Sequence, residues 1–134
     1  MGMTGRGIYA EQQKPNCDAP LKREPERKSV VEVMQGDAYP LPISLYDRER
    51  QTEITPEIAE DVEITIGGIT KSVADGKVFY NEERWIYPLT QDDTFSWRIG
   101  EQPIQGRVKF IGGEVKGVDI GVIVVKKSES REVL

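Results

Sequence analysis

The chain has 134 residues, of which 37% are hydrophobic and 31% are charged, and its formal net charge at pH 7 is −5. A chain of this length can bury one sizeable core, so we expect one globular domain. It has no histidine and a single cysteine, Cys17, which excludes Ser-His and Cys-His catalytic pairs and an internal disulfide.

The charge is uneven along the chain. Residues 1–28 carry six Lys/Arg against four Asp/Glu, a net charge of +2, which leaves −7 for residues 29–134. Phosphate contacts need clustered positive charge, so we expect no nucleic-acid partner. No apolar run approaches the roughly 18–20 residues that span a bilayer, and the first residues lack the apolar core of a secretory signal. We therefore expect synthesis in a reducing cytoplasm and no membrane partner.

Residues 1–28 are predicted to form an extended N-terminal arm. They contain Pro15, Pro20 and Pro25, many charges and few large apolar side chains. This composition cannot support a core. We expect the arm to contact a neighbouring subunit through Ile8 and Tyr9, and a disordered tail is the alternative.

Residues 30–46 mark the start of the folded domain, which we place at 29–134. An apolar run at 30–34 is followed by the turn Gln35-Gly36-Asp37, and apolar residues then alternate through 41–45. This period of two predicts a half-buried strand. Pro40 and Pro42 have no N–H for a sheet ladder, so the strand is predicted at a sheet edge, where another chain could add. Tyr39 lies off the apolar face and is a candidate contact residue.

Strand and turn signals alternate through the middle of the chain. Thr55-Pro56-Glu57 predicts one helical turn. Strands are predicted at 62–66 and 69–73 around Gly67-Gly68, followed by strands at 78–81 and 84–89. Asp75-Gly76 predicts a hairpin between 69–73 and 78–81.

The last forty residues continue the same pattern. Thr90 and Asp93 have capping-box spacing and predict a short helical turn, after which Phe95, Trp97 and Ile99 resume a period of two. Strands at 104–111 and 114–120 flank Gly112-Gly113, and Gly121 is predicted to end the second of them before a last strand at 122–125. About eight short strands without a long helix predict an all-β fold, an antiparallel sandwich or barrel.

Four aromatic residues fall within thirteen positions. We expect Trp85 and Phe95 to fill the core, and Trp97 with the adjacent Arg98 to form a contact surface. No motif supports catalysis or a cofactor. The segment Gly67–Ser72 lacks the spacing and the following helix of a phosphate loop, and the acidic turns match no calcium-loop spacing. We therefore expect a protein that is not an enzyme and holds no metal.

Residues 34–134 resemble small tail-associated proteins from phages and prophages of gut Firmicutes, and are more distantly similar to the N-terminal domain of the phage baseplate upper protein family. The motifs that carry the resemblance are Gln35-Gly36-Asp37-Ala38-Tyr39 with Leu41-Pro42-Ile43, the segment 61–68, WIYPLTQDDTF at 85–95, residues 107–119 in part, and Ser130 to Leu134. The resemblance implies an immunoglobulin-like β-sandwich and a non-enzymatic virion protein, present in symmetric copies and bound to other virion proteins. Residues 1–28 lie outside it.

Three functions remain open at this point. The first is a tail or baseplate component that docks by its β-domain and reaches a neighbour with its arm. The second is a capsid decoration or head-closure protein, because small β-domains with arms also occur there. The third is a carbohydrate-binding or receptor-binding module that makes a glycan contact through Trp97, Tyr87 and Tyr39.

Overall fold

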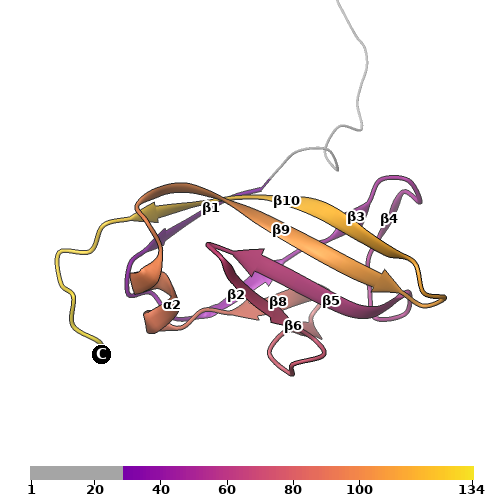
Figure 1. Cartoon of the computed structure of the whole chain (residues 1–134), viewed down its shortest axis with the longest axis horizontal. Helices are drawn as coiled ribbons and strands as arrows, with labels where there is room; N and C mark the ends of the chain where they lie inside the picture. The colour runs from indigo at the N-terminus through magenta and orange to yellow at the C-terminus, as the bar shows by residue number, and fades with distance from the viewer. Residues whose placement is uncertain (1–28) are drawn as a thin grey trace, which may run out of the picture.

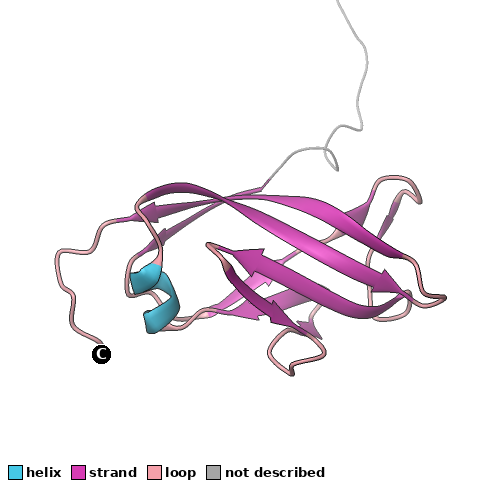
Figure 2. Cartoon of the chain, in the orientation of Figure 1, coloured by secondary structure: helices cyan, strands magenta, loops and turns pink. Residues whose placement is uncertain are grey.

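The computed structural model of the chain describes residues 29–134 (Figure 1). The predicted arm, with Ile8 and Tyr9, lies outside the described residues. The described part is mostly strand, with one short helix, as the sequence predicts for an all-β fold (Figure 2). In chain order its elements are β1 (Ser29–Met34), β2 (Pro40–Ile43), β3 (Tyr46–Asp47), β4 (Thr52–Glu53), β5 (Ala59–Ile66), β6 (Ile69–Ser72), β7 (Phe79–Asn81), β8 (Arg84–Pro88), α2 (Gln91–Ser96), β9 (Gly100–Phe110) and β10 (Val115–Lys126).

The larger sheet has five strands in the order β1-β10-β9-β5-β6. The β5–β6 and β9–β10 pairs are hairpins, with turns at Gly67-Gly68 and Gly112-Gly113 as predicted. All neighbours are antiparallel except β1 and β10, which run parallel, so the prediction of a purely antiparallel fold is wrong for this pair. β1 and β10 are the first and last strands, and no short turn between them dictates an antiparallel direction.

A smaller sheet has the order β2-β8-β7, and β3 and β4 form a separate two-stranded ladder. β2 lies at the edge of its sheet and pairs only with β8 among the described strands, which confirms the prediction from Pro40 and Pro42. Within β2 the side chains alternate, with Leu41 and Ile43 buried and the two prolines exposed.

One hydrophobic cluster takes its buried side chains from both sheets. β5 supplies Val62, Ile64 and Ile66, each with no exposed surface, at alternate positions. Burying such a side chain contributes about 1.5–3 kcal/mol relative to leaving it exposed. The aromatic rings of β8 enter the same cluster with their polar atoms paired. The Trp85 indole N–H donates to the Ile54 carbonyl at 2.8 Å, and the Tyr87 hydroxyl donates to the Ile69 carbonyl at 2.8 Å.

One predicted turn differs from the structure and another agrees with it. Asp75-Gly76 does not close a hairpin, because β6 pairs with β5 in the larger sheet and β7 pairs with β8 in the smaller one. The loop carries the chain from one sheet to the other and is closed locally, where the Lys77 and Val78 amides donate to the Ser72 carbonyl. Thr55-Pro56-Glu57 gives a hydrogen-bonded turn, in which the Ile58 and Ala59 amides donate to the Thr55 carbonyl at 3.0 Å.

The end of the chain differs in two further respects. Phe95 belongs to α2, so the strand predicted through Phe95, Trp97 and Ile99 is wrong. Gly121 does not end a strand, since β10 continues through a β-bulge between Asp119 and Gly121. A bulge bends a strand without ending it. A glycine in the sequence can mark either a bulge or the end of a strand, so the sequence alone does not distinguish the two.

Candidate contact surface

The helix α2 lies at one end of the molecule, beside the C-terminal segment (Figure 1). Thr90 caps it as predicted. The Thr90 hydroxyl accepts from the Asp93 amide at 3.1 Å, and the Asp93 carboxylate accepts from the Thr90 amide at 3.3 Å. This capping box satisfies two backbone donors at the start of the helix.

A buried lysine links α2 to both sheets through hydrogen bonds. Lys71 of β6 has a side chain only 6% exposed, and its ammonium group pairs with the Asp93 carboxylate and donates to the Pro88 carbonyl. The same ammonium lies 4.9 Å from the centre of the Tyr87 ring. Burial acts to raise the pKa of Asp93, but the hydrogen bonds from Lys71 and Thr90 outweigh it and lower that pKa below its usual value. Burial, followed by the Asp93 charge, raises the pKa of Tyr87.

The turn Gln35-Gly36-Asp37 is bound to the other side of α2. The Gly36 amide donates to the Thr94 hydroxyl at 2.8 Å, and that hydroxyl donates to the Asp37 carbonyl at 3.0 Å. The Gln35 side-chain amide donates to the Trp97 carbonyl at 3.0 Å. Gly36 has φ +96°, and a Cβ there would lie 2.8 Å from the Phe95 ring, so the contact requires glycine.

The C-terminal segment completes this cluster. The Arg131 guanidinium donates to the Gln35 side-chain oxygen at 2.7 Å and lies 4.9 Å from the centre of the Phe95 ring. The Leu134 amide donates to the Gln91 side-chain oxygen at 2.9 Å. We call residues 35–37, 90–97 and 130–134 together the α2 cluster. It brings together three segments that are far apart in the sequence.

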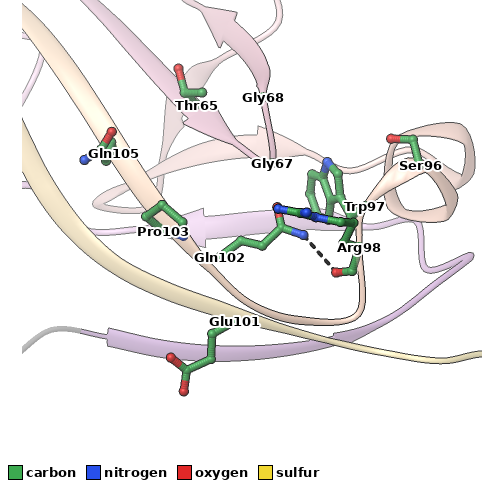
Figure 3. Close-up of a pocket in the computed structure, with 10 residues that line it drawn as sticks. All are labelled: Thr65, Gly67, Gly68, Ser96, Trp97, Arg98, Glu101, Gln102, Pro103 and Gln105. Carbon is green, nitrogen blue, oxygen red and sulfur yellow. Dashed lines mark hydrogen bonds between the residues drawn. The ribbon is translucent and has the colours of Figure 1, made fainter.

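Trp97 is part of this cluster, and the prediction that it forms a contact surface is wrong. Its side chain is only 2% exposed. Gly67, with φ +57°, packs against it so closely that a Cβ would lie 2.5 Å from the indole ring (Figure 3). Among the described residues, the Trp97 indole N–H has no hydrogen-bond partner. The period of two had suggested an exposed ring, but the end of α2 turns it inward.

Arg98, in contrast, is exposed and borders a shallow cleft of about 540 Å³ between the β5–β6 turn and the start of β9. Gln102 in this cleft donates to the Arg98 carbonyl at 2.8 Å, and Glu101 also lines the cleft (Figure 3). The cleft therefore offers one guanidinium, one carboxylate and several amide and hydroxyl groups, but no exposed aromatic face.

The remaining predicted contact residues lie on or beside β2. Tyr39 is 38% exposed, and burial and the Asp37 charge raise its pKa. Pro40 and Pro42 are exposed. The Leu89 amide donates to the Tyr39 carbonyl, so residues 39, 41 and 43 face β8 and the two proline nitrogens face outward. Within β2 this edge has no outward N–H donors at Pro40 and Pro42, which makes it a poor site for another strand and argues against the strand addition expected there.

The arrangement also excludes the aromatic platform suggested for sugars. Tyr87 has no exposed surface and Trp97 is 2% exposed, which leaves Tyr39 alone of the three. Trp85 is buried as predicted, at 3% exposure, whereas Phe95 is only partly buried between Gly36 and Arg131.

Sequence reasoning missed two exposed apolar residues on β1. Val30 is 67% exposed and Met34 is 44% exposed, on the side of the strand that also carries Glu32. The alternation with the more buried Val31 and Val33 was the available signal, but apolar residues at both alternating positions concealed it.

A second charged cluster lies around β3 and the β9–β10 turn. The Asp47 carboxylate, whose side chain is 4% exposed, pairs with Arg50 at 2.6 Å and with Lys116 at 3.4 Å. Lys116 also pairs with Glu49 at 2.6 Å. Burial acts to raise the pKa of Asp47, but these hydrogen bonds lower it overall. The cluster holds the two-stranded ladder against the larger sheet.

The described residues contain no group of three or more acidic or cysteine side chains placed to hold a metal ion. No helix among residues 29–134 is long and apolar enough to cross a membrane. No family model, curated protein or solved structure matches the chain.

Proposed function

We propose that this chain is a non-enzymatic structural protein of a phage virion, a tail or baseplate component. Its β-domain docks on other virion proteins, and residues 1–28 contact a neighbouring subunit. Copies of the chain stand in a symmetric assembly.

The α2 cluster is the observation that carries this proposal. Gln35-Gly36-Asp37, the Thr90–Phe95 part of the aromatic motif and Ser130 to Leu134 all belong to the resemblance to phage tail-associated proteins. They bind one another through the Gly36–Thr94 and Arg131–Gln35 hydrogen bonds. Because these three motif segments contact one another, we treat them as one structural feature, and this supports the resemblance as a whole.

We also propose that the domain is an immunoglobulin-like β-sandwich. Support comes from the strand order. With β2, β5, β6, β7, β8, β9 and β10 read as strands B, C, C′, D, E, F and G, the larger sheet becomes GFCC′ with β1 added beside strand G, and the smaller sheet becomes BED. The shared hydrophobic cluster supports face-to-face packing of the two sheets.

The test is to purify the particles that carry this gene product and to count its copies by quantitative mass spectrometry. A tail or baseplate component is expected at three, six or twelve copies per particle. Hundreds of copies would instead identify a capsid decoration protein. Absence from particles would overturn the virion proposal altogether.

The role of residues 1–28 needs a separate comparison. A version of the gene that encodes only residues 29–134 is expected to give soluble protein that no longer enters particles. Full-length protein carrying Ile8→Asp and Tyr9→Asp is the matched variant that keeps the chain length. Normal incorporation of both variants would contradict a contact made by the arm.

A further inference from the structure

Three of the four outer edges of the two larger sheets are closed to another strand. β2 lacks outward N–H groups at Pro40 and Pro42. On β6, the Ser72 amide donates to the Asp75 carboxylate at 3.2 Å, and the Ser72 carbonyl already accepts from the loop that follows. β7 has three residues and ends in a turn where Glu82 and Glu83 have φ values of 51° and 68°. A long added strand cannot form a ladder along any of them.

Within residues 29–134, no strand lies beside the outer edge of β1 at Val30 and Glu32. The Gln35 amide donates to the Lys126 carbonyl at 2.9 Å, so the odd-numbered residues face β10 and the even-numbered ones face outward. At the end of the strand, the Met34 amide donates to the Asp37 carboxylate at 2.9 Å, and the Asp37 amide donates back to the Met34 carbonyl at 3.0 Å. Asp37 thus closes one end, and among the described strands β10 is the only neighbour of β1.

The surface beside this edge is apolar on either side of Glu32, which pairs with Lys126 at 3.1 Å. Val30 is paired across the sheet with Val122, which is paired with Pro103. A strand added to β1 would place every second side chain next to this row and next to the exposed Met34. An apolar residue in the added strand therefore gains a contact that a polar one does not.

We propose that the outer edge of β1 binds residues 7–11 of a second copy of this chain as an added strand. This segment, Gly-Ile-Tyr-Ala-Glu, holds two of the few large apolar residues of the first 28, Ile8 and Tyr9. The arm as a whole has a net charge of +2 and residues 29–134 a net charge of −7, which favours approach of the arm to a neighbour, whereas residues 7–11 themselves carry only the acidic Glu11. The inference rests on the proposed function only in requiring neighbouring copies.

The length and composition of the intervening chain favour a second copy over the same one. Residues 9–29 can span up to about 65 Å at about 3.3 Å per residue. Pro15, Pro20 and Pro25 favour extended backbone along this length. An extended linker would hold Ile8 and Tyr9 far from the β1 edge of their own chain. At that distance they can reach the β1 edge of a neighbouring copy. A short strand binds weakly alone, and several arms in one assembly add their effects.

Cross-linking of the full-length protein tests the proposal. In a Cys17→Ser background, Ala10→Cys and Val30→Cys are combined, and equal amounts of normal and ¹⁵N-labelled protein are mixed and treated with a short bismaleimide. About half of the cross-linked pairs are expected to join a light chain to a heavy chain. The control combines Ala10→Cys with Phe79→Cys, since Phe79 is 48% exposed on the short edge strand β7. We expect at least tenfold less cross-linking there.

Two further variants separate docking from folding. Glu32→Pro removes an outward N–H and keeps the backbone hydrogen bonds to β10, although it also removes the exposed Glu32–Lys126 ion pair. Tyr9→Asp changes only the arm. Each is expected to lower the Ala10–Val30 cross-link about tenfold while the thermal unfolding midpoint stays within a few degrees. Equal cross-linking to Phe79, or cross-links confined to single chains, would overturn the inference. Either result would overturn this inference alone, because the proposed function is tested independently by the copy number in particles.

Discussion

Two residues at the β5–β6 turn, Gly67 and Gly68, are alike in sequence but not in surroundings. Both have positive φ, at 57° and 83°, so both favour glycine over any residue with a Cβ. Only Gly67 lies against Trp97, whose ring leaves no room for a methyl group, whereas a Cβ on Gly68 would meet nothing within 4 Å. The Trp97 ring is therefore buried partly because its neighbour has no side chain.

This difference gives a matched pair of substitutions. Both Gly67→Ala and Gly68→Ala place an alanine at positive φ, which strains the backbone, but only Gly67→Ala also forces the Trp97 ring to move. We expect Gly67→Ala to lower the free energy of unfolding by about 1–3 kcal/mol more than Gly68→Ala, the usual cost of overpacking. Urea unfolding followed by tryptophan fluorescence measures both. Equal losses would mean that the turn relaxes away from the ring.

The pairing of Lys71 with Asp93 predicts a pH dependence. The folded pKa of Asp93 lies below its unfolded value of about 3.9, so the carboxylate stabilises the fold above that pH. Its contribution is lost as the pH falls through the lower, folded pKa. Asp93→Asn should cost about 2–4 kcal/mol at pH 7, slightly less than a fully buried pair because Asp93 is 15% exposed.

Urea unfolding at a series of pH values between 2 and 7 checks this. The difference between the wild type and Asp93→Asn is expected to shrink steadily below about pH 4. Asp92→Asn, at an exposed position in the same helical turn, is the control and should cost under about 1 kcal/mol. A difference that stays constant down to pH 2 would contradict the assigned role of the charge pair.

Among the elements, α2 depends most on distant parts of the chain. It has only six residues, too few to be stable alone, and it is held by Lys71, by the Gly36 turn and by the C-terminal segment. Arg131 makes two of these contacts, a hydrogen bond to Gln35 and a cation–π contact with Phe95.

Removing that guanidinium should loosen the C-terminal segment without unfolding the sheets. Arg131→Ala is expected to cost about 1–2 kcal/mol and to speed amide exchange in residues 128–134. Arg107→Ala, at an exposed position on β9, is the control and should stay within about 0.5 kcal/mol of the wild type. Unchanged exchange in the segment would show that Arg131 does not hold it.

The elements also show what the sequence could predict and what it could not. The Gly-Gly hairpins, the Thr90 capping box and the edge position of β2 follow from local residue chemistry, and the structure has them. The parallel pairing of β1 with β10 and the passage between sheets at Asp75-Gly76 depend on contacts across the whole chain. The burial of Trp97 depends on Gly67, thirty residues earlier, which a period of two within one segment cannot reveal.

At the scale of the whole molecule, the two sheets share one hydrophobic cluster and should unfold together. Trp85 lies in the smaller sheet, and Trp97 packs against the β5–β6 turn of the larger one. Each tryptophan therefore reports on a different part of the same cluster. If the sheets were separate units, the two reporters would have different unfolding midpoints.

The single-tryptophan variants Trp97→Phe and Trp85→Phe make this measurable. Each variant will have its own stability, so the comparison is made within a variant, between tryptophan fluorescence and the far-ultraviolet circular dichroism of the sheets. We expect the two signals to give the same urea midpoint and slope in each variant, as two-state unfolding requires. In Trp85→Phe, whose remaining tryptophan lies in the α2 cluster, a fluorescence midpoint below the dichroism midpoint would mean that the α2 cluster opens first. That outcome would place the α2 cluster outside the cooperative core.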